Sequence, residues 1–124
     1  PNITWLGPIE NSKLPEYYNR TRLFIHTSPL DYHPRVIDEA QACGLPVMVF
    51  KGRIKSDILP ETCGIQLSKQ RYSKQISNLL NDHSRLQKMG QNARQHALIH
   101  AGPEACMKAL ETMLIRFESR KTDV

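Results

Sequence analysis

The chain has 124 residues, enough for one domain at most, and 40% of them are hydrophobic and 23% charged, as in ordinary globular domains. No apolar run approaches the roughly 20 residues that a membrane-spanning helix needs. The formal net charge of +5 favours an anionic partner, which would be nucleic acid, a membrane surface or a phosphorylated ligand. Lys and Arg are scattered and aromatic residues make up only 6%, so the sequence does not favour nucleic-acid binding by base stacking.

The cysteine usage indicates reduced thiols. Cys43, Cys63 and Cys106 are odd in number and form no C-x-x-C pair. This pattern argues against a disulfide framework and against a zinc site, so we expect no metal centre and a cytoplasmic location.

The first half of the chain alternates strand and helix patterns, which is typical of an α/β domain. Ser12 is placed to cap a short helix that runs through Tyr18. Pro34 opens a second helix that runs to Cys43 and stops at Gly44, with Pro at its first position and Gly past its end. Four short apolar runs predict strands at residues 3–6, 23–26, 46–50 and 64–67.

The second half is helical, and Gly102-Pro103 separates its last two helices. We interpret its apolar stripes as core faces. They are Tyr72, Ile76, Leu79 and Leu80; Leu86, Met89, Ala93 and Ala97; and Met107, Leu110, Met113, Leu114 and Phe117. The sequence therefore predicts one domain over residues 1–124, with a Rossmann-like parallel sheet in residues 1–68 and a helical segment in residues 69–124.

The stretch of residues 27–46 carries the clearest functional signal, because a strand ends there in a polar loop that feeds a helix. The first-turn amides of such a helix have no intrahelical partner and, with the helix dipole, form an anion site. Asp31 lies just before the helix and Glu39 lies in its second turn, eight residues on. Two carboxylates flanking a phosphate site suit a nucleotide sugar, whose sugar and ribose hydroxyls lie on either side of the diphosphate.

Structural interpretations of the same residues stay open at this point. Asp31 would then be a helix-start residue favoured by the dipole. Arg35 would pair with Glu39 one helical turn later, or with Asp38 at i,i+3.

The same stretch resembles the E-x7-E region of retaining glycosyltransferases of the GT-B fold (glycosyl transferases group 1). The family pattern runs P-S-x-x-E-G-F-G/P-x-x-x-x-E-A-x-A-C-G-x-P-V. Ser28 matches the serine, Asp31 the first acid and Glu39 the second, and the run from Glu39 to Val47 follows closely. Further segments agree in order and spacing: Ile3–Gly7 with V-x-F-L-G, Leu14–Tyr18 with L-x-x-x-Y, Gly64–Leu67 with G-x-L-V, and residues 79–82 and 89–94 with the closing helices.

The resemblance implies roles for these residues. Asp31 and Glu39 would be the catalytic pair, with Asp31 on the hydroxyls of the donor sugar and Glu39 on the ribose. The amides of Arg35 and Val36 would receive the diphosphate, together with Ser28 on the preceding loop. The base would lie near Gly7 and Pro8. The donor would be a nucleotide diphosphate sugar, and neither a cofactor nor a metal ion would be needed.

Three positions depart from the family pattern. Asp31 is one methylene shorter than the usual Glu, which changes its reach, and Pro34 has no N–H to donate. The Gly-Gly-x-x-E loop after the third strand keeps only Gly52. Arg53 or Lys55 in that loop would contact phosphate, or would be solvated surface charges.

The resemblance begins at the third strand of a six-stranded donor domain, so we expect the chain to be truncated at its N-terminus. An acceptor-binding domain or subunit would then lie outside this chain, and the parent enzyme would transfer a hexose, with peripheral membrane association as one option. His26 and His33 are candidates by residue type alone. Two alternatives are a non-catalytic nucleotide-sugar-binding subunit and, less favoured, a basic nucleic-acid-binding domain.

Overall fold

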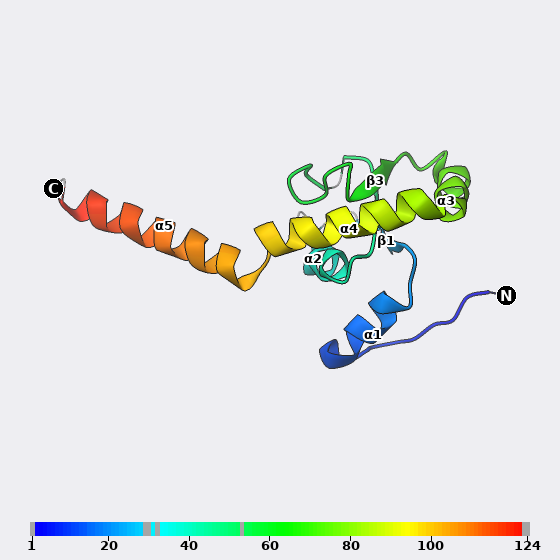
Figure 1. The fold of residues 1–124 in the computed structure, drawn as a ribbon, viewed down its shortest axis with the longest axis horizontal. Coiled ribbons are helices and arrows are strands. Elements are labelled where there is room, and N and C mark those ends of the chain that lie inside the picture. Colours follow the sequence, from blue (N-terminus) through cyan, green and yellow to red (C-terminus); the bar gives the residue numbers. More distant parts are fainter. Residues whose placement is uncertain (1, 29–30, 32, 53, 123–124) are drawn as a thin grey trace.

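The computed structural model describes residues 2–28, 31, 33–52 and 54–122, and within the last helix it describes side chains up to Ile115, except that of Leu114. The elements, in chain order, are the 3-10 turn η1 (Asn11–Lys13), α1 (Leu14–Asn19), β1 (Phe24–His26), α2 (Arg35–Ala42), β2 (Val47–Phe50), β3 (Gly64–Leu67), α3 (Tyr72–Asn81), α4 (His83–His100) and α5 (Pro103–Thr122). Figure 1 shows an α/β body from which α5 extends away.

The sheet has three parallel strands in the order β1-β2-β3. Phe24 pairs with Val47 across the first strand pair, and Val47 pairs with Gly64 across the second. Parallel neighbours need crossover connections, and α2 supplies the first of them between β1 and β2. The expected α/β class with a parallel sheet is confirmed, and the strands at residues 23–26, 46–50 and 64–67 are found with ends shifted by at most one residue.

Two apolar clusters hold the body together. Val47 and Val49 of β2 alternate with Met48 and point to one face of the sheet, where they meet α1, α2 and α4. That cluster comprises Tyr18, Ile37, Ala40, Leu45, Val47, Val49, Ile54, Ile58, Leu59, Cys63 and Ala93. A second cluster joins α3 to α4 through Leu79, Leu86 and Met89. The stripe predicted on α4 is therefore a core face, as expected.

The packing of α2 on α4 rests on a close backbone approach. Gly44 follows α2 with φ +72°, a conformation that favours glycine at the end of a helix. A Cβ added to Gly90 of α4 would overlap the carbonyl oxygen of Gly44. Arg94 of α4 donates from Nη1 to the carbonyl of Ala42, 2.8 Å away, and satisfies one of the last carbonyls of α2. The end of α2 is thus held directly against α4.

The predicted strand at residues 3–6 is wrong. That segment forms no strand, and the side chains of Ile3 and Trp5 are 89% and 92% exposed. A strand is stabilised by a neighbour that takes its backbone hydrogen bonds. Among the described residues β1 pairs only with β2, so the segment at residues 3–6 has no strand beside it. β1 itself is an edge strand, with Ile25 44% exposed.

Two helix predictions also need correction. Ser12 does not cap α1, because it lies inside the 3-10 turn and the residue before α1 is Lys13, in helical conformation. Pro34 is the N-cap of α2 and not its first helical residue.

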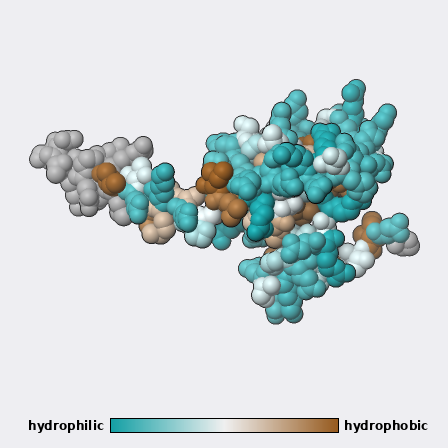
Figure 2. Space-filling model, in the orientation of Figure 1, coloured by the Kyte–Doolittle hydropathy of each residue, from teal (hydrophilic) through white to brown (hydrophobic). Residues whose placement is uncertain are grey.

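The apolar stripe predicted on α5 is not a core face at its described positions, since Met107, Leu110 and Met113 are all exposed. Leu114 and Phe117 lie outside the described side chains. Figure 2 shows hydrophobic side chains at the junction of α4 and α5, where Leu98 and Ile99 are exposed.

Gly90→Ala should destabilise the chain although alanine is the better helix former. The new methyl group has no room against the Gly44 carbonyl, so α4 must shift away from α2. We expect a loss of about 1–3 kcal/mol in the free energy of unfolding, measured by chemical denaturation. Gln91→Ala on the exposed side of α4 is the control and should change stability little. Equal stability of Gly90→Ala and the wild type would contradict this packing.

A purified polypeptide of residues 1–124 should self-associate or melt at low temperature. The open edge of β1 and the exposed apolar residues at positions 3–6 both invite pairing with another chain. Size-exclusion chromatography combined with thermal melting measures this. A monodisperse monomer with a cooperative transition would show that the open edge has no such effect.

Candidate functional site

The candidate site lies at the carboxyl ends of β1 and β2, where ligands of open α/β sheets bind. His26 ends β1, and the loop that follows carries Ser28, which is half-buried. Gly52 lies in the turn after β2 with φ +78°, a backbone conformation that favours glycine. Ring atom Nε2 of His26 is buried and has no hydrogen-bond partner among the described residues.

The helix that follows this loop begins without a side-chain cap. Pro34 is its N-cap, and among the described residues no side chain caps the first turn. The first backbone hydrogen bond at this end of the helix runs from the Ile37 amide to the Pro34 carbonyl, across 2.9 Å. The amides of Arg35 and Val36 precede it and belong to the donors that an α-helix leaves unpaired. These two amides therefore keep the capacity to bind an anion.

Glu39, in the second turn of α2, faces α1. The hydroxyl of Tyr18 donates to Oε2 of Glu39 across 3.3 Å. The two residues lie on a cavity of about 300 Å³ between α1 and α2, which is lined by Asn11, Leu14, Pro15, Tyr18, Glu39, Ala42 and Cys43. The wall is largely apolar and carries one carboxylate, an arrangement suited to a ligand with a hydrophobic body and hydroxyl groups.

Tyr18 is held from two sides. Its ring packs edge-on against Phe24 of β1, with 5.7 Å between the ring centroids, and the residue is 9% exposed. Burial raises the pKa of Tyr18 to about 12, and the charge of Glu39 and its hydrogen bond add to the rise. The phenol therefore stays protonated at neutral pH and acts as a donor.

Asp31 does not line the cavity beside Glu39. Its Oδ1 accepts from the His33 amide at 3.3 Å, a local turn that orders the loop before α2. His33 in turn contacts Oδ2 of Asp38 through Nε2 at 2.9 Å. Neither Asp38 nor Glu39 pairs with Arg35 within the described ranges, so both predicted pairings are wrong.

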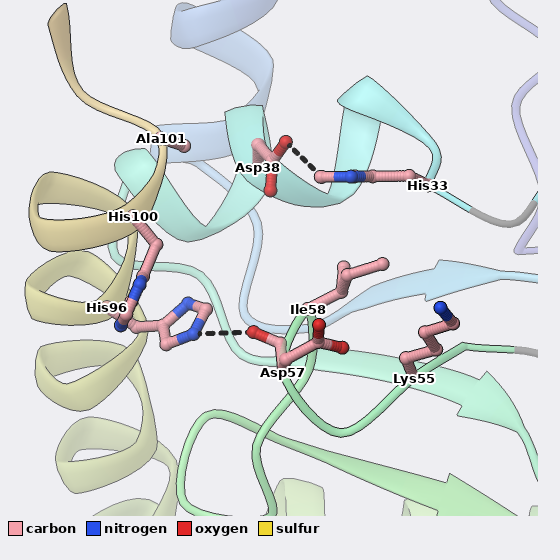
Figure 3. A pocket seen from close by; sticks show the side chains of 8 residues that line it. All are labelled: His33, Asp38, Lys55, Asp57, Ile58, His96, His100 and Ala101. Carbon is pink, nitrogen blue, oxygen red and sulfur yellow. Dashed lines mark hydrogen bonds and ion pairs between the residues drawn. The ribbon is translucent and has the colours of Figure 1, made fainter. Parts of the chain in front are cut away.

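A second cavity, of about 360 Å³, lies on the other side of α2, and the sequence did not point to it. It is lined by His33, Asp38, Lys55, Asp57, Ile58, His96, His100 and Ala101 (Figure 3). Behind it Gln41 is fully buried; its amide donates to the Ile58 carbonyl at 3.1 Å, and its Oε1 lies 3.2 Å from Nδ1 of His96. The sequence signal that could have indicated this cavity was Gln41, a polar residue at a buried position of α2.

His96 connects α4 to the loop after β2, since its Nε2 lies 2.9 Å from the Asp57 carbonyl (Figure 3). Both ring nitrogens face oxygen acceptors, and a neutral imidazole donates only one proton. Burial lowers the pKa of His96, and the charge of His100 lowers it further. The hydrogen bond to Asp57 opposes this shift but is outweighed.

The remaining predicted residues lie on the segment before α1, on the first turn of α2 and on the loop after β2. Gly7 has φ +66° and is half-buried on the segment before α1. Val36 is half-buried and Arg35 exposed on the first turn of α2. Arg53 lies outside the described residues.

No cluster of three or more His, Cys, Asp or Glu side chains suited to a metal ion occurs among the described residues. Of the helices in those same ranges, none has the length and apolarity to cross a bilayer.

The fold defines a Rossmann-like α/β domain with a parallel sheet, the class in which ligands bind at the carboxyl ends of the strands. The sequence model of the family Glycosyl transferases group 1 matches residues 1–96, so the chain belongs to that family. The match confirms the resemblance to group 1 glycosyltransferases, and it spans every lining residue of the cavity between α1 and α2. Comparisons with curated proteins and with solved structures found no match.

The lowered pKa of His96 predicts a pH dependence of stability. The unfolded ring titrates near 6.5 and the folded ring below that value, so the unfolded state binds more protons in between. Stability should therefore rise with pH up to about 6.5 and then level off with respect to this group. Chemical denaturation at pH 5 to 8 measures the rise, which should be smaller in His96→Gln. An equal slope in both proteins would contradict the assignment.

Proposed function

We propose that this chain is the nucleotide-sugar-binding part of a retaining glycosyltransferase of the GT-B fold. The parent enzyme would transfer a hexose from a nucleotide diphosphate sugar to an acceptor held by a domain or subunit outside this chain. The donor would be the only small molecule required, without a metal ion or another cofactor. The family supports transfer of a glycosyl group, and the geometry around α2 supports the assignment of residues.

The observation that carries the proposal is the position of Glu39. Its carboxylate lies on the cavity between α1 and α2, one helical turn beyond the free amides of Arg35 and Val36. A nucleoside diphosphate fits this order, with its phosphates at the amides and its ribose hydroxyls at the carboxylate. The apolar wall of the cavity then covers the nucleoside, and Gly7 on the segment before α1 remains the candidate for the base.

Catalysis would rest on stabilising the leaving group. Negative charge grows on the diphosphate as the bond to the sugar breaks, and oriented amides and nearby cations meet it. Arg35 and Val36 would supply the amides, and Ser28 on the loop after β1 and Gly52 on the loop after β2 would contribute beside them; Arg53, the proposed cation of the second loop, lies outside the described residues. Asp31 would hold hydroxyls of the sugar from the loop before α2.

One observation favours the second candidate, a nucleotide-sugar-binding module without activity of its own. Lys55, a cation of the loop after β2, lines the cavity on the far side of α2 from Glu39. A subunit that binds the donor and relies on another chain for cations would have this layout. Mixing the chain with acceptor domains and measuring transfer separates the two candidates.

Glu39→Gln should weaken binding of UDP or GDP and leave the fold stable. Losing a charge-assisted hydrogen bond to ribose costs about 1.5–3 kcal/mol of binding free energy, roughly a tenfold or greater rise in Kd. Isothermal titration calorimetry measures Kd, and chemical-shift mapping in the same samples should place the perturbations at Asp31–Val36 and Glu39.

The matched control is Asp38→Asn, one residue earlier on α2, where the carboxylate faces His33. Both variants remove one negative charge near an anionic ligand, and the weaker Coulomb repulsion alone would tighten binding. Weaker binding in Glu39→Gln with unchanged or tighter binding in Asp38→Asn therefore identifies a direct contact. Shift changes confined to α4 and α5, or unchanged Kd in Glu39→Gln, would overturn the proposed site.

A further inference from the structure

We infer that Tyr18 is a positioning residue for nucleotide recognition, whose phenol holds the Glu39 carboxylate in the orientation that accepts the ribose hydroxyls. This inference rests on the proposed function and adds a specific role for a residue of α1. Tyr18 touches the carboxylate and lies on the same cavity.

The contact fixes a side chain that would otherwise be free. The Glu39 side chain is exposed, and a solvated glutamate samples many rotamers that must be lost on binding. The Tyr18 hydroxyl engages Oε2, 3.3 Å away. A carboxylate oxygen pair has about four acceptor sites, so Oε1 and the second lone pair of Oε2 stay available to a ligand. Glu39 is thereby partly ordered before the nucleotide arrives, which lowers the cost of binding.

The donor is itself rigid. Tyr18 is 9% exposed and its ring packs against Phe24 of β1, a partly buried residue that contacts the main apolar cluster. The packing against β1 therefore holds the Tyr18 ring in place, and the Tyr18 hydroxyl in turn holds the Glu39 carboxylate of α2. Tyr17, the preceding residue, is 38% exposed and does not line the cavity. Of the two adjacent tyrosines, Tyr18 contacts Glu39 and lines the cavity and Tyr17 does not, so substitutions of the two form a matched pair.

Tyr18→Phe removes the hydroxyl and keeps the ring. We expect Kd for UDP and GDP to rise about two- to tenfold, the range for one net hydrogen bond, while Tyr17→Phe binds as the wild type does. The loss should vanish in two settings that remove the ribose contact. These are the Glu39→Gln background and 2′,3′-dideoxynucleoside diphosphates as ligands.

The outcomes separate this inference from the proposed function. Unchanged affinity in Tyr18→Phe, or an equal loss with the dideoxy ligands, would overturn the positioning role while leaving the nucleotide site intact. Failure of the wild-type chain to bind UDP, GDP or ADP would overturn the proposed function and this inference with it.

A ligand-free measurement covers the case in which Tyr18→Phe does not fold. The phenol of Tyr18 titrates at about 12, partly because of Glu39. Carbon-13 tyrosine spectra across alkaline pH, with circular dichroism to verify the fold, should show an earlier ionisation of Tyr18 in Glu39→Gln. Identical titration of Tyr18 in both proteins would show that the two side chains are not coupled and would overturn the inference.

Discussion

The placement of α2 is the constraint on which the site depends. Ile37 and Ala40 are fully buried against the sheet, and the Gly44 carbonyl touches Gly90 of α4, so the helix has little freedom to rotate or slide. Successive residues of a helix point about 100° apart. With Ala40 fixed inward, Glu39 is directed to α1 and Asp38 to the loop after β2. Two cavities of different chemistry on opposite sides of one helix follow from this single packing arrangement.

The sequence predicted the parts of this fold that local patterns specify. The strand predicted at residues 46–50 has a continuous apolar pattern, and it is present as β2. The helix before it has an apolar face and a strong stop signal at Gly44, and it is present as α2. The segment at residues 3–6 has the same apolar pattern but is exposed, because a strand also needs a neighbour and the sheet order provides none. The stripe of Met107, Leu110 and Met113 fails for the same reason, since periodicity marks a face without showing what covers it.

The candidate site divides in a similar way. Spacing placed Glu39 eight residues after Asp31, but spacing does not show which neighbours a carboxylate meets, and the local pairings with Arg35 were the simplest alternatives. In the structure Asp38 meets His33 and Glu39 meets Tyr18, which is 21 residues away in sequence. The partner of Glu39 depends on how α1 folds back on α2, so it could not be found from the helix alone. The resemblance to the family was the signal that raised Glu39 above an ordinary surface acid.

The buried Gln41 extends the same logic to the loop after β2. A polar side chain with no solvent exposure must find partners, and Gln41 finds them in the Ile58 carbonyl and in His96. His96 also reaches the Asp57 carbonyl, so α2, α4 and the loop share one set of hydrogen bonds. That loop also carries Gly52 and Lys55. A substitution at Gln41 would therefore disturb the loop and α4 as well as α2, because this one buried side chain bonds to both.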